Sequence, residues 1–486
     1  MLFNSIEFAV FLPIVFLLYW FVFQKSISNQ NLLILLVSYI FYAWWDWRFL
    51  FLLAFSTFLD YFAGLKIEQS NTKSRSKFWL ILSIGINLGF LGFFKYYNFF
   101  VNELTAAIAN AGIRIDPWTL KVILPVGISF YTFHGLSYII DVYKKRIVAE
   151  KHFVDYAVFV SYFPLLVAGP IERATHLLPQ FKRARTFNYQ NAADGMRQIL
   201  WGLFKKVVIA DNCATYANAI FNSSGEHNGS SLFIGALFFT FQIYGDFSGY
   251  SDIALGVSRL FGIELLRNFA FPYFSRDIAE FWRRWHISLS TWFRDYLYFP
   301  LGGSQGGTWM KVRNTFIIFV VSGFWHGANW TFLAWGFLNA LYFIPLLLLD
   351  KNRNNIDIIS THKLLPSLKE FFQIMVTFFL TVIAWIFFRS DTIAQAFSIL
   401  REIFSKSAFQ TPDFLGKHDM IYLLIHCTMI GVLLVMEWLH RDKQHALQFN
   451  AGTARSTAKR WAIYATIVVC ILLFGGKQNN FIYFQF

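Results

Sequence analysis

Residues 281–303 have the sequence FWRRWHISLSTWFRDYLYFPLGG, which places His286 and three arginines among tryptophans, tyrosines and leucines. A second histidine, His326, lies in SGFWHGANW, inside a run from residue 314 to 349 that contains no Asp, Glu, Lys or Arg. An ionisable side chain is costly to hold in apolar surroundings, so its presence there indicates a function. The two histidines therefore predict proton chemistry in a membrane-embedded protein.

The composition places the chain among membrane proteins. Of its 486 residues, 56% are hydrophobic and 14% are charged, whereas soluble domains carry about 25% charged residues. The 60 phenylalanines and 17 tryptophans cannot all lie in a soluble core, because a soluble surface must stay polar. We therefore predict an all-α polytopic membrane protein and reject a soluble enzyme with a large core.

Apolar runs long enough to cross a bilayer recur along the chain. A spanning helix needs about 20 mostly apolar residues. The first run, residues 8–23, has no basic segment before it and no Ala-x-Ala site after it, so we expect a transmembrane helix and not a cleaved signal. The other uncharged runs are residues 78–94, 122–140, 371–388, 420–436 and 461–476.

Less regular runs complete the count. Residues 32–45 and 49–65 flank two charged residues, so they form two short spans or one bent span, and residues 156–171 contain two prolines that favour a kinked or re-entrant segment. Residues 232–245 precede charged residues that should face protein, and residues 314–349 are long enough for two helices joined at Gly323, Gly327 and Asn329. We expect about eleven spans in all, in one domain over residues 1–486, with a motif-rich core at about 120–345 and C-terminal helices at 371–476.

The net charge of +14 is concentrated in loops between the apolar runs. Residues 66–77, 172–206 and 441–460 are basic, which predicts that these loops face the cytoplasm and contact anionic lipid headgroups. No basic soluble domain is present, so we expect no nucleic-acid partner. The three cysteines are far apart and match neither a metal-ligand spacing nor a disulfide framework, so we expect no metal site.

His326 is the stronger candidate for a reactive group. The apolar run before it is too short to cross the bilayer alone, so the histidine should end a helix within the membrane, where Gly327 lets the backbone turn. Non-helical backbone at that depth is tolerated only when it is buried in protein or lines a watery cavity. The alternative is an interfacial histidine in an aromatic belt beside Trp325 and Trp330.

His286 has two readings of equal weight. Aromatic and aliphatic residues recur at a spacing of three to four over residues 281–293, which predicts an amphipathic helix. Arg283, Arg284 and Arg294 could then bind a phosphate-bearing donor or lipid headgroups. In the other reading, the segment is an interfacial helix that lies flat on the cytoplasmic leaflet, and His286 is structural.

Three carboxylates, Asp60, Asp246 and Asp252, lie in or beside apolar segments. Such groups could carry protons or ions. They do not form an evenly spaced series across several helices, so we favour structural pairing with a nearby cation, with Arg259 as a candidate partner for Asp252.

The chain lacks the GxGxxG, Walker, HExxH and GxSxG motifs, which argues against the simplest dehydrogenases, NTPases, zinc peptidases and serine hydrolases. A histidine with no nucleophile and no metal set beside it suits general-base catalysis. The imidazole would take the proton of an acceptor hydroxyl as that hydroxyl attacks an activated acyl group.

At this point the motifs resemble a known family. The segments FWRRWHISLSTWFRDYLYFPLGG and SGFWHGANWTFLAWG are similar to those of the membrane-bound O-acyltransferases, and most similar to the bacterial alginate O-acetyltransferase branch. PVGISFYTFHGLSYIIDVY, VAGPIERATHLLPQF, YGDFSGYSDIALG and the opening MLFNSIEFAVFLPIVFLLYW resemble the same branch. The resemblance runs from residue 1 to about residue 343, and the C-terminal third fits by hydropathy only.

The resemblance implies a ring of transmembrane helices with re-entrant segments around a central tunnel. It implies that His326 is the family's invariant histidine and His286 its second characteristic position. The acyl donor would be a cytoplasmic thioester, acetyl-CoA or an acyl-carrier protein, used as a substrate with no tightly bound cofactor. The acceptor would be an extracytoplasmic polysaccharide, often reached through a periplasmic SGNH-type acetyltransferase partner, and the location would be the bacterial inner membrane.

The sequence is also compatible with other functions. D-alanyl transfer and peptidoglycan O-acyl transfer belong to the same chemical class. A transporter without a covalent step would depend on Asp246 or Asp252 rather than on His326. A scaffold that only docks a secreted acetyltransferase would depend on neither histidine.

Overall fold

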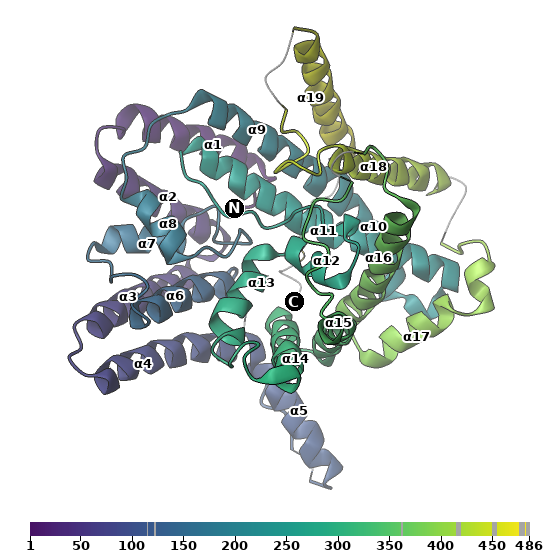
Figure 1. Ribbon diagram of the computed structural model, residues 1–486, viewed down its shortest axis with the longest axis horizontal. Coiled ribbons are helices and arrows are strands. Elements are labelled where there is room, and N and C mark those ends of the chain that lie inside the picture. The colour runs from purple at the N-terminus through teal and green to yellow at the C-terminus, as the bar shows by residue number, and fades with distance from the viewer. Residues whose placement is uncertain are drawn as a thin grey trace. The chain divides into compact units, whose positions relative to one another are not determined.

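The computed structural model describes residues 1–113, 115–120, 123–360, 363–414, 419–449, 454–475 and 482. Every regular element in these residues is a helix, so the predicted all-α class is confirmed for the part of the chain that is described (Figure 1). The chain divides into two compact units, residues 1–192 with 257–266, and residues 193–256 with 267–486.

The first unit is built from the N-terminal helices and a short return of the chain after residue 256. Three of its helices, α2, α3 and α4, are long and apolar, and α6 packs against α3 and α4. Its elements are α1 (Ile6–Leu17), the π-helical turn η1 (Leu18–Val22), α2 (Ile27–Asp46), α3 (Arg48–Glu68), α4 (Lys73–Leu91), η2 (Gly92–Tyr96), α5 (Tyr97–Asn110), α6 (Ile128–Tyr143), α7 (Phe153–Ser161) and α8 (Ala174–Phe181).

The second unit holds both predicted histidines. It begins within α9 (Tyr189–Leu203) and includes most of α11 (Gly229–Leu260). The remaining elements are η3 (Phe204–Ala210), α10 (Asp211–Asn222), η4 (Ser224–Glu226), η5 (Pro272–Phe274), α12 (Ile278–Arg284), α13 (Ile287–Phe293), η6 (Arg294–Tyr298), α14 (Gly307–His326), α15 (Trp330–Leu348), α16 (Leu368–Arg389), α17 (Ile393–Ile403), η7 (Lys406–Phe409), α18 (Asp419–Leu439) and α19 (Ala454–Phe474).

Seven helices of the described residues are long and apolar enough to cross a membrane, against about eleven expected from the sequence. The two runs on either side of Asp46 and Arg48 form separate helices, which settles that choice in favour of two spans. The seven are Ile27–Asp46, Arg48–Glu68, Lys73–Asn110, Trp330–Leu348, Leu368–Arg389, Met420–Leu439 and Ser456–Phe474.

Three of the remaining runs show how apolar side chains can be buried by protein as well as by lipid. The run at 122–140 becomes α6, which begins only at Ile128 and is buried along almost its whole length; residue 122 lies outside the described residues. The run at 156–171 contributes only the nine-residue α7, which ends at Ser161 before the first proline. Helix α1 with η1 is shorter than the other spans.

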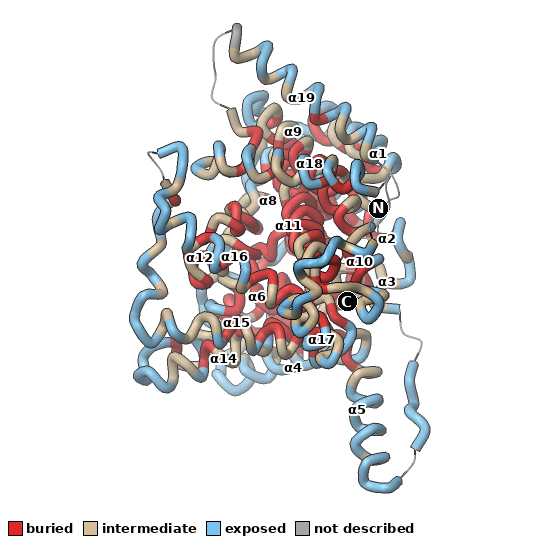
Figure 2. Tube along the Cα trace, turned by 90° about the vertical axis from the view of Figure 1, so that its right-hand side faces the viewer, coloured by how far each residue is buried: buried red, intermediate tan, exposed pale blue. Residues whose placement is uncertain are grey.

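Helix α11 is the most deeply enclosed long element. It contains 32 residues, or about 48 Å at 1.5 Å per residue, and Figure 2 shows it buried along most of its course. Helices α5 and α19, by contrast, are exposed over most of their surface. A helix enclosed by protein can carry polar side chains that a lipid-facing helix cannot.

The pair α14 and α15 is the two-helix unit that the sequence predicted for residues 314–349. Helix α14 ends at His326, and α15 begins at Trp330 after Asn329, whose side chain accepts a hydrogen bond from the backbone N–H of Thr331. Glycines let the two backbones approach closely: a Cβ at Gly323 would collide with the carbonyl oxygen of Phe332, and one at Gly336 with that of Phe319. This close approach fixes the position of His326.

We predict that Gly323→Ala destabilises the protein by about 1–3 kcal/mol, because the added methyl group must push α14 away from α15. The measurement is the melting temperature of the purified protein in detergent. Gly85→Ala in α4 is the matched control, since no atom lies within 4 Å of its Cβ. The control should keep or raise stability, because alanine has the higher helix propensity; equal melting temperatures for the two variants would contradict the packing argument.

Candidate functional site

The predicted amphipathic helix over residues 281–293 is interrupted at His286. Helix α12 ends at Arg284 and α13 begins at Ile287. His286 itself has φ 43° and ψ 53°, in the left-handed region that non-glycine residues rarely adopt. Such strain persists only where the surroundings impose it, and it gathers at functional sites.

A short segment after α11 holds this break in place. The backbone N–H of Ala270 donates to the carbonyl of Arg284 at 2.9 Å, and the N–H of Ile287 donates to the carbonyl of Asn268 at 2.9 Å. The break is therefore clamped on both sides by residues 268–270, which the sequence gives no reason to place there.

The imidazole of His286 is buried and is hydrogen-bonded through one nitrogen. Its side chain is 1% exposed, and Nδ1 lies 3.1 Å from Oδ1 of Asn268, which also accepts from the Ser288 hydroxyl at 2.9 Å. With an amide oxygen as the partner, Nδ1 carries the proton. Nε2 then bears a lone pair, and it has no hydrogen-bond partner among the described residues.

Burial also fixes the charge of His286. Loss of hydration lowers the pKa of the imidazole to about 3, so the ring is neutral at physiological pH. The edge-on ring of Phe247, with its centroid 4.6 Å away, forms part of the enclosure. A neutral imidazole with an unengaged lone pair in a dry site is suited to accept a hydrogen bond from a hydroxyl group, whereas its low pKa makes it a weak base.

His326 lies in the same aromatic cluster. It is the last residue of α14 and is 5% exposed. Its ring centroid lies 5.1 Å from that of Trp335 and 5.2 Å from that of Phe388. The ring of Trp325 lies 4.8 Å from His326 and 6.2 Å from His286, so the structure brings both histidines to one indole.

Further tryptophans extend this enclosure. The ring centroid of Trp385 lies 5.8 Å from that of Trp335 and 5.0 Å from that of Trp285, the residue that precedes His286. The cluster thus joins α12, α14, α15 and α16 around the two imidazoles. The sequence also allowed His326 to lie in an aromatic belt at the lipid interface. A histidine that is only 5% exposed does not fit that alternative.

The three candidate arginines have different surroundings. Arg283 donates to the backbone carbonyls of Asn352 and Asn355, both at 2.8 Å. Arg284 pairs with Glu280 at 2.6 Å, and Arg294 pairs with its half-buried neighbour Asp295 at 2.9 Å. Arg283 and Arg294 are both exposed, but Arg283 and Arg284 hold the chain around α12, whereas Arg294 contacts the residue next to it.

Lysines, which the sequence did not indicate, pair with two carboxylates of α11, the buried Asp246 and the partly buried Asp252. Asp252 pairs with Lys205 at 2.5 Å, so the expected assignment of Arg259 as its partner is corrected to this lysine. Asp246 pairs with Lys206 at 2.8 Å. Both lysines lie on the π-helical turn η3, whose wider winding turns two successive side chains toward α11.

Two polar groups of this region escaped the sequence analysis. Glu437, near the end of α18, is 1% exposed and accepts a hydrogen bond from the Tyr244 hydroxyl at 2.7 Å, with Lys205 4.0 Å away. A lone glutamate at the end of an apolar run would have been found by the criterion applied to the histidines. Asn268 carried no comparable signal, because a single asparagine in a loop is common.

Asp60, in the first unit, is held by neutral donors. Its carboxylate accepts from the Ser83 hydroxyl at 2.5 Å and from the Asn87 amide at 2.7 Å. Hydrogen bonding between helices α3 and α4 is thus its structural role. The partners that the structure gives Asp60 are hydroxyl and amide groups, in place of the cation that the sequence analysis favoured.

Comparison with known proteins gives a consistent result. Residues 143–388 match the membrane-bound O-acyltransferase family. The chain is 37% identical to the probable alginate O-acetylase AlgI of Pseudomonas putida over 508 aligned residues, and this alignment covers 100% of both chains. It is 41% identical to the protein of that name from Pseudomonas aeruginosa, over 90% of this chain and 81% of the relative. It is also 33% identical to the peptidoglycan O-acetyltransferase of Helicobacter pylori, over 100% and 98% of the two chains.

We predict that Lys205→Met destabilises the protein by about 3–5 kcal/mol, because it removes the buried cation that lies beside both the partly buried Asp252 and the buried Glu437. The measurement is thermal unfolding in detergent. Lys443→Met, which removes one member of the half-exposed pair with Asp442, is the control and should change the melting temperature little. A Lys205→Met protein as stable as the control would show that the buried pair is not needed for the fold.

Proposed function

The chain belongs to the membrane-bound O-acyltransferase family, and we propose that this multi-pass O-acyltransferase acetylates an extracellular polysaccharide of the alginate type. The proposal of acetyl and alginate is supported by relatives that match over the full length of the chain. The observation that carries the mechanism is the pair of buried histidines on either side of Trp325.

His326 is proposed as the general base. The acceptor hydroxyl oxygen attacks the thioester carbonyl carbon, and the imidazole takes the hydroxyl proton. The carbon–sulfur bond then breaks, and the thiolate regains a proton from the imidazolium. The products are an ester and a free thiol, so the histidine returns to its starting state.

The aromatic cluster supports this chemistry by keeping water out. A thioester is already activated, so the protein must supply proximity and a base. A thioester that met bulk water would hydrolyse instead of transferring its acyl group. The burial of both imidazoles beneath Trp335, Phe388 and Phe247 fits that requirement.

His286 is proposed to orient the reacting groups. Its Nε2 can accept a hydrogen bond from a hydroxyl, while Asn268 holds the opposite side of the ring. A donor thioester, acetyl-CoA or an acyl-carrier protein, would approach from the cytoplasm. Arg294 is the candidate arginine best placed to meet its phosphate, because its exposed guanidinium group pairs with the neighbouring Asp295 and not with a distant loop as Arg283 does. The inner membrane and a periplasmic SGNH-type partner complete the proposal.

Peptidoglycan O-acetylation is the second candidate, because the Helicobacter pylori relative also matches over the full length. D-alanyl transfer stays a further member of this chemical class. A transporter that uses Asp246 or Asp252 is less well supported, since lysines neutralise both carboxylates. A pure scaffold would not require two enclosed imidazoles.

We predict that His326→Ala lowers acyl transfer by at least about 10²–10⁴-fold, because a positioned general base contributes that much. The measurement is incorporation of labelled acetate into secreted polymer by a deletion strain that expresses the variant. Labelled alanine in parallel distinguishes acetyl from D-alanyl transfer, and analysis of the ester-bearing sugar distinguishes alginate from peptidoglycan. The exposed His152→Ala is the control. Polymer acetylation that survives in a folded His326→Ala protein would refute the role of the base.

We predict that His286→Ala lowers the rate less completely than His326→Ala, and that Asn268 acts on the rate through His286. Asn268→Asp keeps an acceptor for Nδ1 but puts a negative charge beside the ring, which favours the imidazolium and raises the pKa of His286. The acid limb of the pH–rate profile should therefore move to higher pH in Asn268→Asp, while His286→Ala abolishes that shift. An unchanged profile in a folded Asn268→Asp protein would make Asn268 purely structural.

A further inference from the structure

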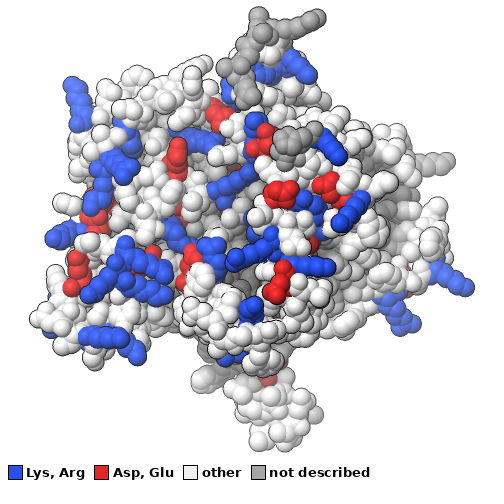
Figure 3. Space-filling model, in the orientation of Figure 1, with Lys and Arg blue, Asp and Glu red and all other residues white. Residues whose placement is uncertain are grey.

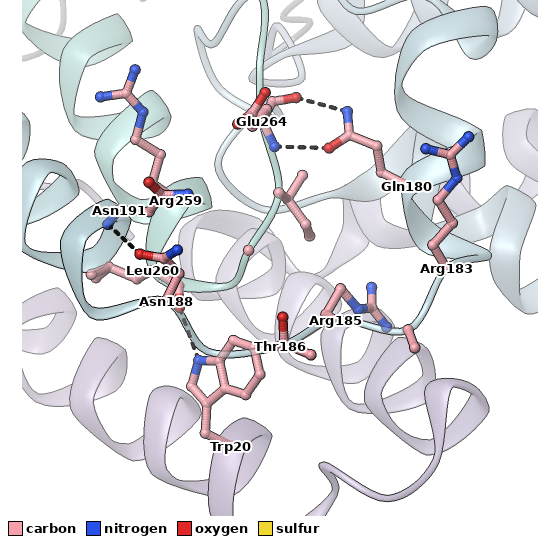
Figure 4. Close-up of a pocket in the computed structure, with 13 residues that line it drawn as sticks. Trp20, Gln180, Arg183, Arg185, Thr186, Asn188, Asn191, Arg259, Leu260 and Glu264 are labelled. Atoms are coloured by element: carbon pink, nitrogen blue, oxygen red, sulfur yellow. Dashed lines mark hydrogen bonds between the residues drawn. The ribbon is translucent and has the colours of Figure 1, made fainter.

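A basic pocket in the first unit lies apart from the histidine cluster in sequence and has no part in the proposed mechanism. Its volume is about 330 Å³, and its walls come from η1, the loop after α8 and the turn after α11 (Figure 4). Three arginines line it, Arg183, Arg185 and Arg259, against one carboxylate, Glu264. The pocket therefore favours an anion.

Hydrogen bonds at two ends of the pocket fix the positions of its walls. Trp20 donates from Nε1 to the carbonyl of Leu260 at 2.9 Å. Across the pocket, the side-chain amide of Gln180 donates to the carbonyl of Glu264 at 2.9 Å and accepts from its N–H at 2.8 Å (Figure 4). The turn between these anchors contains Gly262 at φ 71°, a conformation that favours glycine.

Arg185 has donors that the surrounding protein does not use. Its Nη2 donates to Oδ1 of Asn31 at 2.6 Å, and its guanidinium carbon lies 5.4 Å from the centre of the Tyr19 ring. Its Nε and Nη1 are buried and, within the described residues, have no hydrogen-bond partner. Buried donors without partners are costly, and an arginine fork fits the oxygens of a phosphate group.

The helix that borders the pocket has an exposed apolar surface. Helix α1 and η1 expose an apolar stripe in which Ile6 is 81% and Phe21 70% accessible, as expected for a surface that faces lipid. Trp20, in η1, is 7% exposed, so its indole faces the pocket and the protein rather than the apolar stripe. Two of the pocket's arginines, Arg183 and Arg185, belong to the basic segment 172–206, which the charge bias assigns to the cytoplasmic side.

Figure 3 shows lysine and arginine side chains spread across one face of the molecule, with acidic side chains beside many of them. Most such basic groups are at the surface and would attract any anionic headgroup. The pocket differs because it also has volume, a tryptophan wall and unused buried donors.

We propose that this pocket binds a phosphate group, supplied by the headgroup of an anionic phospholipid or by a soluble phosphate ester. Arg185 would grip the phosphate oxygens from within, Arg183 and Arg259 would neutralise the charge, and Trp20 would cover the apolar side. The site does not depend on acyl transfer by His326, and its test does not measure acyl transfer.

The test uses the delipidated full-length protein in neutral detergent, titrated with phosphatidylglycerol, phosphatidylcholine or inorganic phosphate and followed by native mass spectrometry. We expect a preference for phosphatidylglycerol over phosphatidylcholine. Each pocket arginine should contribute about 5-fold to affinity, so the double variant Arg183→Gln, Arg259→Gln should bind about 25-fold more weakly. Glu264→Gln should bind more tightly, because it removes the negative charge from the wall.

Arg75→Gln is the matched control, since Arg75 is an exposed arginine of α4 in the same unit and outside the pocket. It should leave binding unchanged. Binding of inorganic phosphate that the double variant loses, without a lipid preference, would support the site with a soluble source. A loss as large in Arg75→Gln as in the double variant would overturn the proposal, and so would the absence of tighter binding in Glu264→Gln. The Glu264→Gln arm decides the outcome if the double variant fails to fold.

Discussion

The structure depends on one constraint: a polar group removed from water must find its partner within the protein. In hydrocarbon no water replaces a missing hydrogen bond, and each unsatisfied group costs several kcal/mol. Long helices satisfy their own backbone groups in the apolar segments of the chain. Residues 162–173 after α7 form no regular helix, and all of them are buried in protein.

The same constraint separates two kinds of buried ionisable group in the second unit. Asp246 and Asp252 form ion pairs with lysines of the η3 turn, so their role is to hold that turn against α11. His286 is treated differently, since one nitrogen is held by Asn268 while the other has no partner among the described residues. A charge that is paired stabilises a fold, whereas a neutral base left unengaged in a dry site is available for chemistry.

The aromatic residues connect these two roles. The Tyr244 hydroxyl donates to Glu437, which lies near Lys205. The centre of the Tyr244 ring lies 6.1 Å from that of Trp285, the residue before His286. The unusual aromatic content of the chain thus has a physical purpose beyond contact with lipid: flat, rigid rings close around the imidazoles and exclude water. In the first unit a single indole, Trp20, marks the edge of a basic pocket instead.

The sequence by itself determined the helical membrane class, the pair of helices around residues 323–329 and the two histidines, because hydropathy and isolated ionisable residues are local properties of the chain. It led to an expectation of about eleven spans, whereas seven helices of the described residues are long and apolar enough to cross a membrane; an apolar run has the same pattern whether lipid or protein buries it, as α6 shows. Only the tertiary structure decided that the helix breaks at His286, that Asn268 holds its ring, that Lys205 rather than Arg259 meets Asp252, and that both histidines share Trp325. These features are contacts between segments far apart in the chain, and no local pattern encodes which distant side chain will satisfy a buried polar group.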